Sequence, residues 1–181
     1  MPPPTSRVRI IGGRHRGRSV RFPAIPGLRP TPDRVRETLF NWLGQDLTGC
    51  STLEPYAGSG VLSLEALSRG AVLAVAFDRD PAALRALRAN ALALGAEALE
   101  AHRGDARELL RRETRVFDAV FLDPPYADDP WDWLLPAAHD RLAPDGRLYA
   151  EAGRPLAASP GLALVREGRA GHVHYHLYAR C

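Results

Sequence analysis

The chain has 181 residues, of which 45% are hydrophobic and 25% charged, a composition typical of one globular domain with its own core. No apolar run approaches the roughly 18–20 residues that span a bilayer. The start, Met1 to Ser6, lacks the apolar stretch of a signal peptide, so we expect a cytoplasmic protein without membrane contact. Cys50 and Cys181 have no metal-ligand spacing and are expected to be reduced thiols.

The net charge of +3 is unevenly distributed along the chain. Residues 1–36 hold nine arginines and one acidic residue, so they carry +8 and the remainder carries −5. Apolar alternation in 7–11 and 19–22 predicts a short β-hairpin, with the basic segment 12–18 at its tip. This arm is either a phosphate-binding surface or a solvated extension of the domain.

A helix is predicted to begin after a proline-rich linker. Thr31 is expected to cap it, Pro32 to occupy its first turn and Asp33 to complement its dipole. One helical face is apolar, with Val35, Leu39, Trp42 and Leu43. Arg34 and Arg36 are expected to point away from that face. We therefore divide the chain into a basic arm, 1–30, and one catalytic domain, 31–181.

The next segment predicts a strand, a glycine-rich turn and a helix. The strand and turn cover 52–60, and the helix covers 61–69. Gly58 and Gly60 allow tight backbone geometry and a close approach by a ligand. Glu54 stands just before the turn, where an acid can face a positively charged ligand group.

Two further acids follow predicted strands. The apolar run 72–78 ends in Asp78, which is placed to bind ribose hydroxyls. Asp105, with Ala106 beside it, can reach an adenine amine and can also cap the helix that follows. The third glycine of a dinucleotide fingerprint is absent. Glu54 would repel phosphates but favour the cationic amino group of S-adenosylmethionine, so this set predicts a methyl-donor site.

The apolar run 116–122 leads into Asp123, Pro124, Pro125 and Tyr126. Ligands of open α/β sheets bind at the carboxyl ends of the strands. Asp123 can accept a hydrogen bond from an exocyclic amine, and the prolines leave the neighbouring carbonyls free to point at a substrate. Tyr126 offers a stacking face, a contact estimated at about 1–3 kcal/mol per base. The segment therefore predicts methylation of a nucleobase nitrogen.

Strands and helices alternate from Thr52 onward, which indicates a parallel, doubly wound sheet. A helix is predicted from Pro81 to Leu94, started by Asp80 and stopped by Gly95. The remaining strands are predicted at 99–102, 116–122, 146–151, 162–167 and 173–179. The last two flank a glycine-containing turn and predict a terminal antiparallel pair.

Two groups of residues leave alternatives open. Trp131 and Trp133 either stack on RNA or pack in the core. His172, His174 and His176 alternate on one predicted strand, which is either exposed or RNA-facing, or holds a metal. No carboxylate or cysteine is patterned with these histidines, so we expect no metal.

Two stretches, 10–18 and 27–43, closely resemble the bacterial 16S rRNA (guanine-N2)-methyltransferases of the RsmD type. The resemblance continues through 57–60 and 123–126 to 171–178, so it covers nearly the whole chain. It implies a seven-stranded Rossmann-like class I methyltransferase that converts S-adenosylmethionine to S-adenosylhomocysteine without a metal. The implied target is one guanine of 16S rRNA, in the small ribosomal subunit or an assembly intermediate, and we expect a monomer.

The resemblance also implies roles for individual residues. The cofactor would be lined by Gly58, Gly60, Asp78 and Asp105. The guanine would be held by Asp123, Pro124 and Tyr126. The residues that would contact RNA beside the active-site mouth are Arg14, Arg16, Arg18, Arg29, Arg34 and Arg36. Glu54 stands where many relatives have aspartate, Tyr56 stands where phenylalanine is common, and the 128–133 segment is less typical of the family.

Three other functions compete with this interpretation. An adenine-N6 methyltransferase acting on DNA or RNA also uses an Asp-Pro-Pro-Tyr segment, but the chain shows no separate DNA-recognition domain. A nicotinamide-dependent oxidoreductase is disfavoured by the missing third glycine. A noncatalytic RNA-binding module would have no need of Asp123 in register with the glycine turn.

Overall fold

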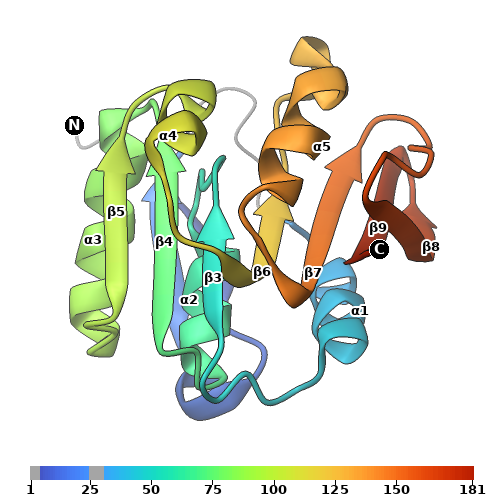
Figure 1. Ribbon diagram of the computed structural model, residues 1–181. Coiled ribbons are helices and arrows are strands. Elements are labelled where there is room, and N and C mark those ends of the chain that lie inside the picture. The colour runs from blue at the N-terminus through green and yellow to red at the C-terminus, as the bar shows by residue number, and fades with distance from the viewer. Residues whose placement is uncertain (1–4, 25–30) are drawn as a thin grey trace.

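A computed structural model describes residues 5–24 and 31–181 and confirms an α/β fold around a seven-stranded sheet (Figure 1). The strand order is β5-β4-β3-β6-β7-β9-β8. The first five strands in that order are parallel, whereas β9 runs antiparallel to both β7 and β8, as predicted. The strands are β3 (Ser51–Glu54), β4 (Leu73–Asp78), β5 (Leu99–Arg103), β6 (Phe117–Leu122), β7 (Leu142–Ala152), β8 (Leu162–Ala170) and β9 (Val173–Arg180).

Helices cover both faces of the sheet. They are α1 (Asp33–Leu43), α2 (Val61–Ser68), α3 (Pro81–Leu94), α4 (Ala106–Arg112) and α5 (Trp131–His139). Alternate residues of β4 separate two cores, with Ala74 and Ala76 facing α2 and α3, and Val75 and Phe77 in the cluster that includes α4 and α5. Figure 1 shows α4 and α5 in front of the sheet and α2 behind it. No helix in the described ranges is long and apolar enough to cross a membrane.

The predicted bounds of α3 are confirmed, because its end signals are local. Asp80 accepts hydrogen bonds from the Ala82 and Ala83 N–H groups at 2.7 and 3.2 Å. Gly95 ends the helix in the left-handed conformation, with a φ of 65°.

The basic arm forms the predicted hairpin. Strands β1 (Thr5–Arg9) and β2 (Ser19–Pro23) pair antiparallel, and a 3-10 turn, η1 (Gly13–His15), lies at the tip. The hairpin is packed into the protein, because its inward side chains join the core around α2 and α3; they are Val8, Ile10, Val20 and Phe22. The boundary between 30 and 31 stays a prediction, and Arg29 lies outside the described residues.

Three predictions about the start of α1 are wrong. Pro32 lies before the helix rather than in its first turn, and it stands in the capping position expected for Thr31, with no side-chain cap there. Thr31 is instead buried, and its side chain lowers the pKa of Glu151. Arg36 does not point outward, since its side chain is 0% exposed. It pairs with Asp33 at 2.6 Å and continues into a buried ion network.

Glu65 is the centre of that network. It pairs with Arg36 at 3.1 Å and with Arg69 at 3.0 Å, and all three side chains are at most 3% exposed. Glu65 also accepts the backbone N–H groups of Ile11 and Gly12 at 2.9 and 2.7 Å. One carboxylate therefore joins the hairpin, α1 and the end of α2.

Candidate active site

Four neighbouring parallel strands carry an acid at or just beyond their carboxyl ends. Glu54 ends β3, Asp78 ends β4, Asp123 follows β6 and Glu151 lies near the end of β7. Leu122 pairs with Ala150, so Asp123 and Glu151 occupy the next paired positions on adjacent strands. The arrowheads of these strands all point to the same edge in Figure 1. The sheet thus gathers the sequence-predicted acids, and adds Glu151.

Burial disfavours the charged forms of three of these acids. It raises the pKa of Glu54 to about 8, although hydrogen bonds from the Ser63 hydroxyl and N–H groups lower this pKa. Burial also raises the pKa of Asp123 well above its usual range, with further increases from Glu151 and then Glu54. The pKa of Glu151 is raised by burial, while hydrogen bonds from Thr31 and Tyr149 oppose the shift. A cation entering this site would favour the charged carboxylates.

The glycine turn after β3 is built as predicted. The Gly58 N–H group donates to Asp78 Oδ2 at 2.7 Å, and the Asp80 N–H group donates to Oδ1 at 2.8 Å. Gly60 precedes α2 with a φ of 69°, and a Cβ added there would overlap the Leu87 side chain. The structure therefore joins Gly58 to Asp78 and packs Gly60 against Leu87.

Asp105 is exposed and caps α4, as expected. Its Oδ1 accepts the N–H groups of Arg107 and Glu108 at 2.9 and 3.3 Å. Ala106, the first residue of α4, is buried. Tyr56 is half-buried, and burial raises its pKa to about 12 with a smaller contribution from the charge of Asp105. Asp105 Oδ2 takes no part in the cap and can face a ligand.

The segment after β6 presents an aromatic ring rather than burying it. Pro124 is buried. Tyr126 is 46% exposed and starts the 3-10 turn η2 (Tyr126–Asp128). Burial raises the pKa of the Tyr126 hydroxyl well above its usual value, and the charges of Asp123 and Glu151 add to the shift. The ring lies against Gly153, where an added Cβ would stand 3.4 Å from the Tyr126 Cδ2 atom. Tyr126 is therefore available for stacking.

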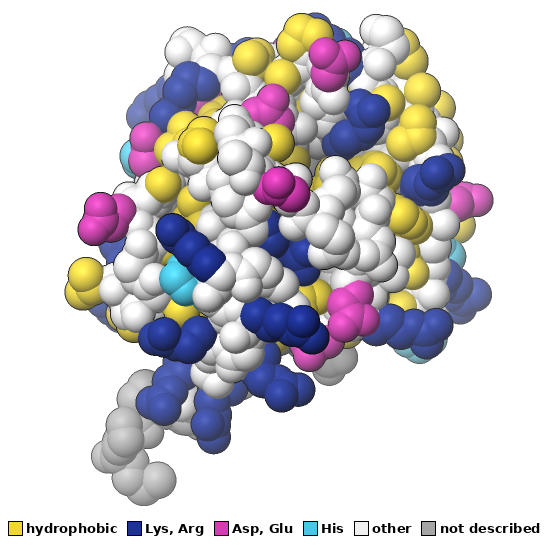
Figure 2. Space-filling model, turned by 90° about the horizontal axis from the view of Figure 1, so that it is seen from below, with side chains coloured by type: hydrophobic (Ala, Val, Ile, Leu, Met, Phe, Trp, Pro, Cys, Tyr) yellow, Lys and Arg dark blue, Asp and Glu magenta, His cyan; other side chains and the backbone are white. Residues whose placement is uncertain are grey.

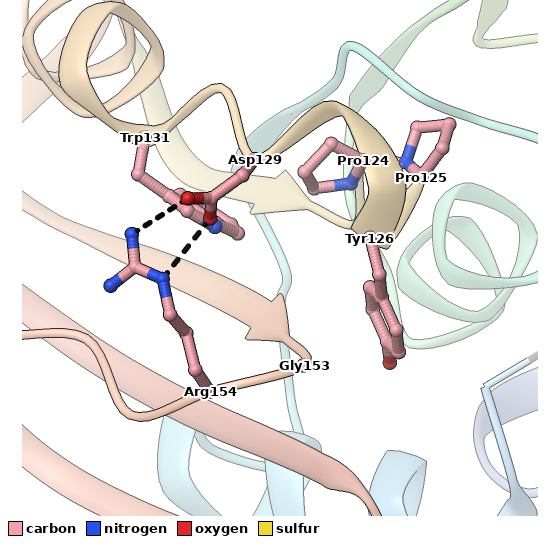
Figure 3. Close-up of a pocket in the computed structure, with 7 residues that line it drawn as sticks. All are labelled: Pro124, Pro125, Tyr126, Asp129, Trp131, Gly153 and Arg154. Atoms are coloured by element: carbon pink, nitrogen blue, oxygen red, sulfur yellow. Dashed lines mark hydrogen bonds and ion pairs between the residues drawn. The ribbon is translucent and has the colours of Figure 1, made fainter.

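A cavity of about 330 Å³ opens beside this segment (Figure 3). Its lining residues are Pro124, Pro125, Tyr126, Asp129, Trp131, Gly153 and Arg154. Trp131 is 6% exposed and belongs to the core, so the packing alternative holds for it. Trp133 is half-buried, with the Arg107 guanidinium carbon 5.2 Å from its ring centroid.

The histidines of β9 do not form one exposed face. His176 is 1% exposed, and its Nε2 atom accepts the Leu156 N–H group at 3.0 Å. The protonated Nδ1 atom then faces the Ala150 carbonyl oxygen at 3.3 Å. Burial lowers the pKa of His176. The prediction of an exposed or RNA-facing strand is wrong for this residue, and the described ranges contain no group of three potential metal ligands.

The hairpin tip lies away from the active-site mouth. The His15 N–H group donates to the Ser68 hydroxyl at 2.9 Å, and Ser68 ends α2. Arg18 Nη2 donates to the Ala93 carbonyl oxygen at 3.2 Å, in the last turn of α3. Both helices begin at the carboxyl edge of the sheet, so their ends mark the opposite edge, where Figure 1 places the hairpin tip. The prediction that the tip stands beside the mouth is wrong.

Several arginines of the hairpin and of α1 are exposed. Arg14, Arg16 and Arg18 are exposed at the tip, and Figure 2, seen from below, shows basic side chains gathered along one side of that face. Arg7 and Arg9 on β1, and Arg34 in the first turn of α1, are also exposed. A second cavity, of about 270 Å³, lies between β1 and the start of α1, lined by Arg7, Val8, Arg9, Thr31, Pro32 and Asp33.

Sequence reasoning missed Glu151 and Arg154 at the site, and Glu65 in the buried network away from it. Glu151 ends a predicted strand, so the rule that identified Asp78 and Asp123 would have found it. Glu65 and Arg154 carry no comparable signal, because their partners lie far along the chain. Arg154 pairs with Asp129 at 3.1 Å, and Glu65 with Arg36 at 3.1 Å.

Comparison with known proteins agrees with this geometry. A family model described as Conserved hypothetical protein 95 matches residues 8–179. Ribosomal RNA small subunit methyltransferase D of Escherichia coli (strain K12) is 38% identical, over 97% of this chain and 91% of the relative. The Haemophilus influenzae protein of the same name is 35% identical, over 98% of this chain and 96% of the relative. The solved structure of yhhF from Escherichia coli superposes with a TM-score of 0.86 at 38% identity, covering 97% of this chain and 98% of that one. The chain therefore belongs to the ribosomal RNA small subunit methyltransferase D family and has the class I fold of S-adenosylmethionine-dependent methyltransferases.

Proposed function

We propose that the protein transfers a methyl group from S-adenosylmethionine to the exocyclic N2 of one guanine in 16S rRNA of the small ribosomal subunit. The observation that carries the proposal is the position of Asp123, Pro124 and Tyr126 at the end of β6, on the strand next to the Gly58 turn of β3. The names of the relatives from Escherichia coli and Haemophilus influenzae support an rRNA substrate. Because the ribosome is the proposed substrate, we propose that the enzyme acts in the cytoplasm. We also propose that it is a monomer.

The residues on β3 and β4 fit the expected cofactor. S-adenosylmethionine supplies an activated methyl group on a sulfonium cation. Glu54 lies near the glycine turn, where its charged form would be favoured by the cationic amino group. Asp78, held by the Gly58 N–H group, is proposed to bind the ribose hydroxyls, and Asp105, beside Ala106, the adenine amine.

Asp123 and Pro124 are proposed to hold the guanine amine. The N2 lone pair is conjugated with the ring, so this nitrogen is a poor nucleophile. Accepting one N–H bond each, the Asp123 carboxylate and the Pro124 carbonyl would favour a pyramidal nitrogen whose lone pair points at the methyl group. In-line displacement then depends mainly on positioning. Hydrogen bonds from the amine favour the charged form of Asp123, which opposes the rise in its pKa caused by burial.

After methyl transfer, the nitrogen carries a positive charge and an extra proton. That proton passes to Asp123 or to water, so no strong base is needed before the transfer. The guanine must leave its stack to reach the end of β6, which is base flipping. Tyr126, 46% exposed, offers the flipped base a face on which to stack.

Exposed arginines of the hairpin and of α1 are proposed to bind the RNA. Arg7, Arg9 and Arg34 would hold phosphates beside the cavity between β1 and α1. Arg14, Arg16 and Arg18 would hold phosphates at the tip, at the edge of the sheet opposite the active site. Contacts spread along the hairpin favour a folded particle over free RNA. Arg36 is left out of this surface because it is buried.

Transfer of labelled methyl groups to three substrates tests the proposal. They are small subunits that lack the modification, naked 16S rRNA and duplex DNA. We expect the subunits to be methylated most rapidly. A preference for DNA would support the adenine-N6 alternative, and equal rates on subunits and naked rRNA would contradict the requirement for a folded particle.

A further inference from the structure

The cavity beside Tyr126 combines apolar walls with one charged pair. Pro124 and Tyr126 supply ring surfaces on one side, whereas Asp129 and Arg154 face each other on the other side, with Trp131 beside them (Figure 3). The volume of about 330 Å³ falls within the range of small-ligand sites, roughly 300–1,000 Å³. Pro124 directly follows Asp123, so the cavity adjoins the residue proposed to bind the amine. Its volume and lining suit a flat base with a polar edge.

The charged pair is bidentate but exposed. Arg154 Nε and Nη2 contact the two carboxylate oxygens of Asp129 at 3.2 and 3.1 Å. The side chains are 53% and 55% exposed, and ion pairs this exposed contribute little to stability. Both groups are therefore accessible to a ligand.

The backbone at Asp129 shapes the loop that carries the pair. Asp129 has a φ of 35° and is the one non-glycine residue with positive φ among those that the structure describes. Aspartate adopts this left-handed conformation more readily than most residues with a side chain. The turn holds the carboxylate of the loop after β6 against Arg154 in the loop after β7.

The pair matches the edge that distinguishes guanine from adenine. Guanine presents an acceptor, O6, beside a donor, N1–H, and then the N2 amine. Adenine presents a donor, its N6 amine, beside an acceptor, N1. A guanidinium next to a carboxylate complements the first pattern and opposes the second.

We propose that Arg154 and Asp129 select guanine as the target base. Arg154 donates to O6 and Asp129 accepts the N1–H group, while Asp123 and Pro124 hold the N2 amine. The inference rests on the proposed function, since it requires a guanine held for transfer to N2. Arg154 and Asp129 act by binding the base edge, and Asp123 remains the residue at the reacting nitrogen.

The test compares two target bases in otherwise identical small subunits. Subunits are reconstituted around rRNA that carries either guanine or 2-aminopurine at the methylated position. 2-Aminopurine keeps the N2 amine but lacks both O6 and the N1–H group. For each enzyme, kcat/KM is measured on both substrates, and the guanine-to-aminopurine ratio is divided by the ratio of the wild type. Intrinsic differences in amine reactivity cancel in this comparison.

Five variants are compared with the wild type: R154A, R154K, D129A, D129N and, as a matched control, R166A. Arg166 is an exposed arginine on the edge strand β8. We expect R154A and D129A to lose about 5- to 150-fold of the preference for guanine, the range of one good base-edge pair. R154K should resemble R154A, because lysine lacks the planar fork. D129N should keep part of the preference, because its amide oxygen still accepts. R166A should keep all of it.

The alternative roles give different results. If Arg154 holds a phosphate, or the pair only joins two loops, R154A and D129A lower both rates equally and the ratio stays at the wild-type value. That result overturns the inference, as does a wild-type enzyme that does not distinguish the two bases. Unchanged binding of S-adenosylhomocysteine checks that each variant is folded. A wild type that forms no N2-methylguanosine on guanine subunits refutes the proposed function itself.

Discussion

Removing the charge of Glu65 should destabilise the protein more than any change at an exposed ion pair. The Glu65 side chain is 0% exposed and receives donors from Ile11, Gly12, Arg36 and Arg69 at 2.7–3.1 Å. The substitution Glu65→Gln keeps the shape but leaves the two buried guanidinium groups without this carboxylate. Breaking a buried pair in this way costs about 3–5 kcal/mol.

Urea unfolding at pH 7 measures this cost. At about 2–4 °C per kcal/mol for a chain of this size, the melting temperature should also fall by about 6–20 °C. The matched control is E100Q. Glu100 pairs with Arg115 at 2.9 Å with a side chain 41% exposed, so its loss should cost less than about 1 kcal/mol. Since Glu65 also holds the hairpin, E65Q should speed proteolysis within residues 5–24. A cost for E65Q no greater than that for E100Q, with an unchanged urea dependence, would refute this account of the network.

Three further results are expected. Asp123→Ala should lower methyl transfer by about 100-fold or more through lost positioning, with cofactor affinity nearly unchanged; near-full turnover would contradict the mechanism. For Glu54, the pKa in the folded protein is about 8 against a usual 4.5, so its contribution to stability is present below pH 4.5 and lost as the pH rises to 8. Urea unfolding from pH 4.5 to 8 should show this decline, and E54Q should flatten it. Replacing Arg14, Arg16 and Arg18 by alanine should reduce the salt dependence of RNA binding by about 0.7–0.9 per lost phosphate contact. Turnover at saturating RNA should stay unchanged, and a fall there would place the tip at the active site.

Much of the fold could be predicted because its signals are local or follow from topology. Asp80 and Gly95 mark the ends of α3 through bonds to their own neighbours. The acids at strand ends could be grouped because parallel strands present their carboxyl ends at one edge. Asp78 and Asp123 were placed in this way, and the structure brings them to that edge.

The wrong predictions concern contacts between distant segments. Arg36 lies one turn before Phe40 and faces the core. Helical periodicity places it on that face, but gives no reason to expect a charged side chain to be buried there. Its partner, Glu65, lies 29 residues away and makes burial possible. The position of the hairpin tip depends on packing against Ser68, 53 residues beyond His15. His176 is likewise buried because Leu156 supplies a donor from another loop.

Nucleoside analysis of the methylated product tests the central claim most directly. Small subunits that lack the modification are incubated with the enzyme and labelled S-adenosylmethionine, and their 16S rRNA is digested to nucleosides. The account predicts that the label is in N2-methylguanosine, at one position, and that Asp123→Ala removes it. Label in N6-methyladenosine, or in no base of the 16S rRNA, would contradict the account.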